Sequence, residues 1–428
     1  MQGGYDWAKR IGQGGMAFRG AEQDWRGELN VGPDMLSKQV AVSMHWQRFS
    51  VPYEFPVVFT EHVFDAENPA LRDVVCRIEP AKRHRVIVFV DDGLLASRPL
   101  LADEIDEYVR HHADAIELVT APVPVPGGEK IKSDLRFIQE IQQRIFDHHM
   151  DRHSFVIAVG GGAVLDAVGF CAATAHRGIR HIRIPTTVLA QDDSGVGVKN
   201  GVNLHGVKNF LGSFAPPFAV LNDIAFALSL SERDKVAGMA EAVKVALIRD
   251  GEFFNWIERN SDRLVTFDQS SMAYLIRRCA ELHMRQIGQG GDPFESGSAR
   301  PLDYGHWSAH RLESLTMHQL RHGEAVAIGM ALDARYSVLA GLLPPGGEDR
   351  ICALLEYIGF DLWHPAMSAT SASGDLLILD GLREFREHLG GELTVTLLGG
   401  IGVGVEVHQI DLNLMRAALG WLKQRVQT

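Results

Sequence analysis

The chain of 428 residues has few cysteines and no long apolar run. Its four cysteines, Cys76, Cys171, Cys279 and Cys352, lie far apart and form no CxxC pair. This pattern excludes a cysteine metal site and favours a reducing, cytoplasmic compartment over a disulfide framework. No stretch approaches about 18 consecutive apolar residues. A basic segment followed by an apolar run is also missing at the N-terminus, so neither secretion nor a membrane association is expected.

Positive charge is scarce as well. The chain has 42 basic and 54 acidic residues, for a formal net charge of −12. This is the wrong sign for a surface that binds a nucleic-acid backbone, so no nucleic-acid partner is expected. Hydrophobic residues make up 46% and charged residues 22% of the chain, which is typical of a globular protein. A chain of this length is expected to form two domains.

The expected elements divide the chain into three parts. Residues 1–50 are rich in glycine and polar residues, and we expect a poorly ordered extension. In residues 51–231, apolar strands such as 155–159 alternate with amphipathic helices such as 100–108 and 135–146. This alternation predicts an α/β fold with a Rossmann-like parallel sheet. Residues 232–428 are predicted to form an all-helical second domain, with helices at 236–248, 272–284, 306–315 and 324–339.

A glycine-rich turn predicts a nucleotide site in the first domain. The segment AVGGGAVLDAVGF, residues 158–170, places three glycines between a strand and a helix. Backbone N–H groups in such a turn bind a pyrophosphate, although the segment lacks the GxGxxG pattern and a purely structural turn is an equal alternative. Asp91 closes an earlier strand, where it would accept hydrogen bonds from a ribose or remain a solvated turn residue.

A second polar loop follows in IPTTVLAQDDSGVGVK, residues 184–199. It carries hydroxyl groups at Thr186 and Thr187, and then Asp193 and Lys199 around a glycine-rich bend. By itself this loop is equally well explained as a simple connection.

Carboxylate and imidazole groups on the later helices predict a metal site. Glu241 and Lys244 lie three residues apart on one face of an apolar helix, so zinc and an anionic substrate, or a structural salt bridge, would neutralise them. His306 and His310 share a helical face, and His322 follows them. One carboxylate and two histidines are typical of a catalytic zinc site with an open position. Spacing favours His306 with His310 as the ligand pair but does not exclude His322.

Residues 86–339 resemble the sugar-phosphate cyclases, the family of 3-dehydroquinate synthase. The shared motifs occur in the family's order: the GGG turn with Asp166, the Arg177–Gly178 pair, PTT, Asp193 and Lys199, Lys208–Asn209, the AE..K helix and GH…H…HGE. The resemblance implies a lyase that uses NAD and zinc, or cobalt in its place. It implies transient oxidation by NAD, phosphate elimination, re-reduction and aldol closure of a seven-carbon keto sugar phosphate.

The resemblance also implies a role for individual residues. The metal ligands would be Glu241, His306 and His322, with His310 at the reacting centre. The NAD positions would be Asp91, Glu129, Lys132, Gly161, Gly162, Asp166, Thr186, Thr187, Phe226 and Ser229. The substrate positions would be Asp193, Lys199, Lys208, Asn209 and Lys244. Arg177 would reach the phosphate in a neighbouring subunit, which implies a homodimer.

The positions expected to bind a substrate carboxylate depart from the family pattern. Arg285 replaces a lysine, Arg300 follows a lost arginine, and Asp303 replaces an asparagine. An aspartate at the position of Asp303 is also typical of the relatives that cyclise sedoheptulose 7-phosphate, but those relatives lack the histidine kept here as His310. The alternatives are therefore a sedoheptulose 7-phosphate cyclase, an NAD- and metal-dependent polyol dehydrogenase, and a non-catalytic scaffold of the same fold.

Overall fold

The computed structural model describes residues 44–205, 207–294, 302–388 and 391–426. Most of the predicted N-terminal extension lies outside these residues. The elements described below all belong to residues 53–428, which form one compact unit.

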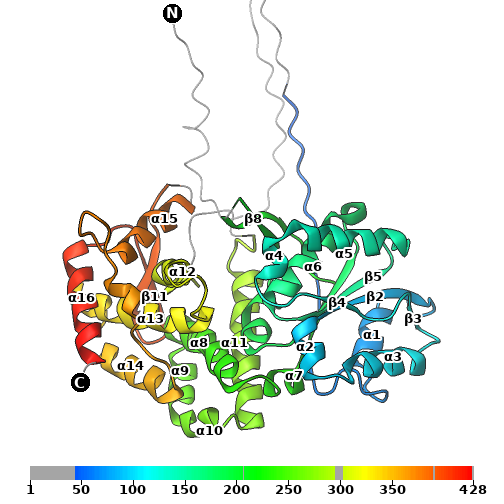
Figure 1. Cartoon of the computed structure of the whole chain (residues 1–428), viewed down its shortest axis with the longest axis horizontal. Helices are drawn as coiled ribbons and strands as arrows, with labels where there is room; N and C mark the ends of the chain where they lie inside the picture. The colour runs from blue at the N-terminus through cyan, green and yellow to red at the C-terminus, as the bar shows by residue number, and fades with distance from the viewer. Residues whose placement is uncertain (1–43, 206, 295–301, 389–390, 427–428) are drawn as a thin grey trace, which may run out of the picture. The chain divides into compact units, whose positions relative to one another are not determined.

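A parallel sheet organises the N-terminal part of this unit (Figure 1). Its strand order is β1-β9-β6-β5-β2-β3, and β4 also pairs with β2. The strands are β1 (Val57–Thr60), β2 (His84–Asp91), β3 (Ile116–Leu118), β4 (Val123–Val125), β5 (Phe155–Gly160), β6 (Arg180–Pro185) and β9 (Ala219–Asp223). All their pairings are parallel. Every residue of β5 is buried, as expected for a central strand that is covered on both faces. The predicted α/β class is confirmed.

Helices cover both faces of the sheet because successive side chains of a strand point in opposite directions. Val86, Val88 and Val90 of β2 belong to one hydrophobic cluster with α1 and α3, whereas Ile87 and Phe89 belong to another with α5 and α6. The helices of this part are α1 (Ala70–Cys76), α2 (Asp92–Ser97), α3 (Leu101–His111), α4 (Lys130–Ser133), α5 (Leu135–Asp147), α6 (Gly162–Thr174) and α7 (Ile224–Leu228), with short helical turns η2 (Ala175–Arg177) and η3 (Ala190–Ser194).

An antiparallel hairpin separates β6 from β9. Its strands are β7 (Lys199–Leu204) and β8 (Val207–Phe214). β7 packs on α6, whereas most of β8 is exposed. The hairpin thus leaves the parallel sheet and lies against α6.

The C-terminal part is mostly helical. Its helices are α8 (Glu232–Arg249), α9 (Gly251–Arg259), α10 (Ser261–Val265), α11 (Gln269–Gln289), α12 (His306–Leu315), α13 (His322–Leu339), α14 (Gly347–Ile358), α15 (Asp380–His388) and α16 (Leu412–Arg425), with 3₁₀ turns η4 (Pro365–Ser368) and η5 (Leu377–Leu379). They enclose one hydrophobic core. None of the described helices has both the length and the apolar character needed to cross a membrane.

The prediction of an all-helical second domain is wrong in one feature. An antiparallel hairpin is formed by β10 (Val395–Gly400) and β11 (Val403–Val407). Its residues Val395, Leu397 and Leu398 belong to the helical core. Strand pairing is favoured here by the β-branched residues and by the turn at Gly402, whose φ of 88° suits glycine. The proposed boundary near Ser231, which is the N-cap of α8, stays a prediction.

Candidate functional site

The glycine turn forms an open helix N-terminus at the carboxyl end of β5. Gly161 is the N-cap of the 13-residue helix α6, and no side chain among the described residues caps it. A Cβ atom on Gly162 would lie 2.6 Å from Ser194 Oγ, and one on Gly161 would lie 3.3 Å from Thr187 Cγ2. Glycine therefore keeps this surface close to the neighbouring loop. The free N–H groups and the helix dipole suit a phosphate group.

Asp91 lies at the end of β2, at the same edge of the sheet. Its Oδ1 accepts hydrogen bonds from the backbone N–H groups of Gly93, at 2.9 Å, and Leu94, at 3.2 Å. A Cβ on Gly127 would lie 2.6 Å from both carboxylate oxygens, so the loop after β4 passes directly over this carboxylate. Asp91 thus has the position of a ribose-binding carboxylate, although its hydrogen bonds also explain it as a helix cap.

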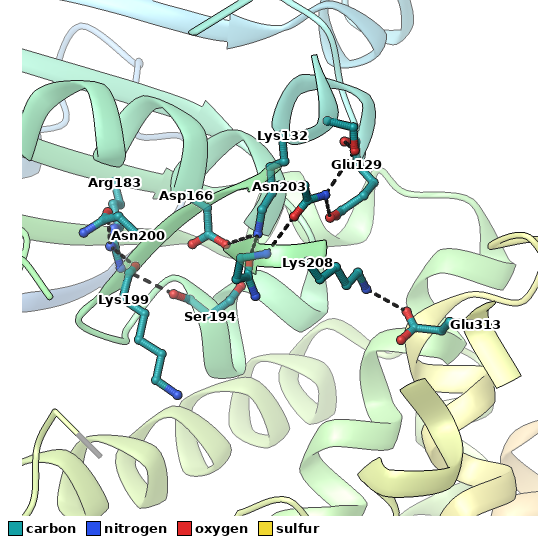
Figure 2. A network of polar contacts seen from close by, with 12 residues as sticks. Glu129, Lys132, Asp166, Arg183, Ser194, Lys199, Asn200, Asn203, Lys208 and Glu313 are labelled. Atoms are coloured by element: carbon teal, nitrogen blue, oxygen red, sulfur yellow. Dashed lines mark hydrogen bonds and ion pairs between the residues drawn. The ribbon is translucent and has the colours of Figure 1, made fainter. Parts of the chain in front are cut away.

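A polar network joins four elements at Asp166, in the second turn of α6 (Figure 2). Lys132 of α4 donates to Asp166 Oδ2 of α6 at 2.7 Å and to Asn209 Oδ1 of β8 at 2.5 Å. Asn203 of β7 donates to Glu129 Oε1 at 2.6 Å and accepts from the backbone N–H of Asn209 at 2.9 Å. The structure therefore brings together Glu129, Lys132, Asp166 and Asn209. The sequence reasoning missed Asn203, a buried polar residue within a strand.

A buried arginine shapes the bend that carries Asp193 and Lys199. The Arg183 guanidinium, on β6, donates to the carbonyl oxygens of Gly197 at 2.7 Å and Lys199 at 2.9 Å. It also donates to Asn200 Oδ1 at 2.8 Å. Burial lowers the pKa of Arg183 to about 10, so the side chain stays cationic at neutral pH. Figure 2 shows the Lys199 side chain extending away from this cluster toward the helices.

Three candidate metal ligands converge in the helical part. Glu241 of α8, His306 of α12 and His322 of α13 each offer one ligand atom, and these atoms lie within 4.8 Å of one another. Glycine allows the helices to approach closely, because a Cβ on Gly323 would overlap the carbonyl oxygen of Ala237 on α8. A carboxylate and two imidazoles at this spacing suit zinc with an open coordination position. The set is the one that the family resemblance implies, not the pair favoured by spacing.

His306 has the protonation state that a metal ligand requires. Its Nδ1 lies 3.1 Å from the carbonyl oxygen of Tyr304, which only accepts, so Nδ1 carries the proton. Burial and the nearby ammonium of Lys244 hold the pKa of His306 well below its usual value. The imidazole is therefore neutral, and Nε2 keeps a lone pair.

Lys244 lies at the centre of a group of carboxylates. Its ammonium forms an ion pair with Glu241 Oε1, and both side chains are buried. Burial alone would lower the pKa of Lys244, but the negative charges of Glu241, Asp193 and Asp303 outweigh it and the pKa is raised. Lys244 thus stays charged and is available to an anionic or hydroxyl-bearing substrate. Asp193 and Asp303, both predicted from sequence to be site residues, are near enough for their negative charges to raise the pKa of Lys244.

His283 is a site residue that the sequence reasoning missed. Its Nε2 lies 3.3 Å from Asp193 Oδ1 and 3.7 Å from Glu241 Oε1. Burial lowers its pKa, but the two carboxylates outweigh burial and raise it. His283 follows Cys279 by four residues, so the two share the buried face of α11. This spacing was the sequence signal that could have indicated a buried histidine. By contrast, the predicted substrate residue Arg285 is exposed on the same helix.

The remaining predicted residues have varied surroundings. His310 is exposed on α12, with its ring centroid 5.4 Å from that of His306 and 6.1 Å from that of His322. The Phe226 ring lies in the hydrophobic core, and the Ser229 hydroxyl donates to the Phe226 carbonyl oxygen at 2.7 Å. Thr186 is buried after β6. Arg300 lies outside the described residues.

Two further groups of possible ligands overlap the first. His310, Glu313 and His322 form one, and Asp193, Glu241 and His283 form the other. Both share a residue with the set of Glu241, His306 and His322. The three groups therefore describe one continuous polar site that runs from the η3 bend to α12.

Comparison with known proteins agrees with this arrangement. The structure is similar to that of ValA, a 2-epi-5-epi-valiolone synthase from Streptomyces hygroscopicus solved with NAD⁺ and Zn²⁺ bound. The TM-score is 0.77 and the sequence identity 27%, over 89% of this chain and all of the other. The fold is therefore that of an NAD- and metal-binding cyclase.

Family models and sequence relatives identify the family. The model of the 3-dehydroquinate synthase N-terminal region matches residues 122–237, and that of the C-terminal region matches residues 238–377. A 3-dehydroquinate synthase of Desulforamulus reducens is 35% identical over 330 residues, which is 76% of this chain and 88% of that protein. One of Halorhodospira halophila is 36% identical over 316 residues, 74% of this chain and 86% of that protein. The chain belongs to the 3-dehydroquinate synthase family.

Proposed function

We propose that this protein is a sugar-phosphate cyclase of the 3-dehydroquinate synthase type, a lyase that eliminates phosphate from a seven-carbon keto sugar phosphate and closes the carbon ring. The observation that carries the proposal is the convergence of Glu241, His306 and His322 next to Lys244, in a chain of this family. A structural salt bridge between Glu241 and Lys244 would not require two imidazoles to meet the same carboxylate.

The described residues fit both cofactors that the family implies. The uncapped first turn of α6 and the carboxylate of Asp91 suit the phosphates and ribose of NAD. Glu241, His306 and His322 suit Zn²⁺, or Co²⁺ in its place. NAD, when bound, supplies reversible hydride transfer, and the metal supplies a positive charge that stabilises a developing alkoxide.

The protein's own residues are proposed to position the substrate and move protons. Lys199 and Lys208, on the hairpin, would bind the phosphate. Asp193 and Lys244 would hold the hydroxyl groups near the metal site. His310 is exposed beside His306 and would exchange a proton with the substrate. Asp303 and Arg300 would contribute to the selection of the substrate.

We further propose a homodimer and a cytoplasmic location. Arg177 lies in η2, directly after the C-terminal end of α6. The family resemblance assigns it to the phosphate bound by a neighbouring subunit, and this role is what supports the proposed dimer. All four cysteines are free and buried, which suits a reducing compartment.

Phosphate release tests the proposed function. Purified protein with Zn²⁺ and substoichiometric NAD should release inorganic phosphate from 3-deoxy-arabino-heptulosonate 7-phosphate or from sedoheptulose 7-phosphate, without accumulating NADH. The comparison of the two sugars decides between the two cyclase activities. His306→Ala should abolish phosphate release. The control is His408→Ala, which changes an exposed histidine directly after β11 and should retain phosphate release. Stoichiometric NADH without phosphate would establish a dehydrogenase instead.

A further inference from the structure

Glu313 connects two parts of the site through a single oxygen atom. Its side chain is 6% exposed, and its Oε1 lies 3.3 Å from Lys208 Nζ of β8 and 3.4 Å from His322 Nδ1 of α13. Its Oε2 is buried and has no hydrogen-bond partner among the described residues. Figure 2 shows Lys208 reaching across from the hairpin to this carboxylate. Lys208 and His322 therefore share the same carboxylate oxygen.

The contact with His322 bears directly on metal binding. A histidine that binds a metal through Nε2 carries its proton on Nδ1, and a carboxylate at Nδ1 fixes the ring orientation and strengthens the ligand. Glu313 also lies two helical turns after His306, so α12 supplies both one candidate ligand and the carboxylate that supports another. The i, i+4, i+7 spacing of His306, His310 and Glu313 places all three near one helical face.

We propose that Glu313 is a positioning residue that links phosphate binding at Lys208 to metal binding at His322. This inference rests on the proposed function, which assigns those two roles to Lys208 and His322. When an anion draws Lys208 away, Glu313 Oε1 loses one of its two ion-pair contacts and interacts more strongly with His322, which becomes a stronger ligand. Anion and metal then bind cooperatively, and by linkage each increases the affinity of the other.

A structural ion pair between the hairpin and α12 is the competing explanation. Lys208 is 43% exposed, so the pair with Glu313 contributes little to stability by itself. A purely structural pair would leave the metal affinity unchanged when either partner is replaced. Metal affinity therefore separates the two explanations, and it is measured without substrate or turnover.

The first experiment measures Co²⁺ affinity by the absorption spectrum of the Co²⁺-bound protein, without NAD or sugar. Glu313→Gln should weaken Co²⁺ binding by about 10- to 100-fold, the usual effect of removing a carboxylate behind a histidine ligand. The matched control is Glu348→Gln on α14, which removes another buried carboxylate, paired with Arg335 of α13 at 2.6 Å, and should leave Co²⁺ affinity unchanged. Wild-type affinity in a folded Glu313→Gln protein would overturn the proposal.

The second experiment tests the linkage with sulfate as a phosphate mimic. Sulfate should increase the Co²⁺ affinity of the wild-type protein, and this increase should disappear in both Lys208→Met and Glu313→Gln. An equal increase in either variant would refute the link through Glu313. Because no turnover is measured, these outcomes are independent of whether the protein cyclises a sugar phosphate. A His322→Ala variant that retains full Co²⁺ affinity would instead refute the ligand assignment on which the link depends.

Discussion

A single buried carboxyl group, Asp333, holds the start of α12 in place. It is fully buried, and its oxygens accept hydrogen bonds from Trp307 Nε1 at 2.9 Å and from the backbone N–H of Gly305 at 3.2 Å. Those two residues flank His306. Burial raises the pKa of Asp333 to about 7, against the opposing effect of the two hydrogen bonds. The orientation of one candidate ligand thus depends on an acid that titrates near neutral pH.

Asp333 should make stability depend on pH. Its pKa is raised in the folded protein, so the folded protein keeps a proton that the unfolded chain releases above about pH 4. The stabilisation is complete below that pH and is lost as the pH rises through about 7. The unfolding free energy of the wild type, relative to Asp333→Asn, should therefore fall by up to about 4 kcal/mol between pH 4 and 8. Denaturant titrations of the metal-free proteins measure this difference, and a flat profile would contradict the prediction.

At the scale of elements, the bend between η3 and β7 depends on Arg183. Replacement by lysine keeps the charge but loses the planar fork that reaches Gly197, Lys199 and Asn200 together. Arg183→Lys should lower the unfolding free energy by about 3 kcal/mol, because buried carbonyl groups lose charged donors. Hydrogen exchange of residues 194–200 should also accelerate. The control Arg180→Lys, on the same strand but paired with Glu79 near the surface, should leave that exchange unchanged.

Helices and central strands were predictable from sequence because their periodicity is local. The predicted helix at 306–315 coincides with α12, and the strand at 155–159 lies within β5. Contacts between distant elements were less accessible. His283 contacts Asp193, and Glu313 contacts His322, only after the helices have packed in the folded protein. Nothing in the sequence around His283 or Glu313 specifies those partners. The β10–β11 hairpin is a local feature, but it was missed because its alternating apolar pattern is short and follows a long helical region.

At the scale of the whole molecule, a metal ion at Glu241, His306 and His322 would join α8, α12 and α13. These helices belong to one hydrophobic core, so the ion would link segments that are far apart in the chain. These three residues, whose ligand atoms lie within 4.8 Å of one another, are the set that the family resemblance implies, whereas spacing alone favoured His306 with His310. Their role as metal ligands stays a prediction. Residue spacing within α12 describes only the geometry of that helix. His322 of α13 reaches the site through tertiary packing, which spacing cannot predict.

Metal binding should therefore stabilise the whole molecule. Free Zn²⁺ at about 100 times its dissociation constant should raise the unfolding free energy by about 2.7 kcal/mol, because the folded state alone brings the three ligands together. Thermal unfolding with Zn²⁺ and with a chelator measures the change. His306→Ala should remove most of it, and His408→Ala should not. Equal Zn²⁺ stabilisation of His306→Ala and the wild type would show that the ion binds elsewhere, since loss of one of three ligands weakens such a site sharply.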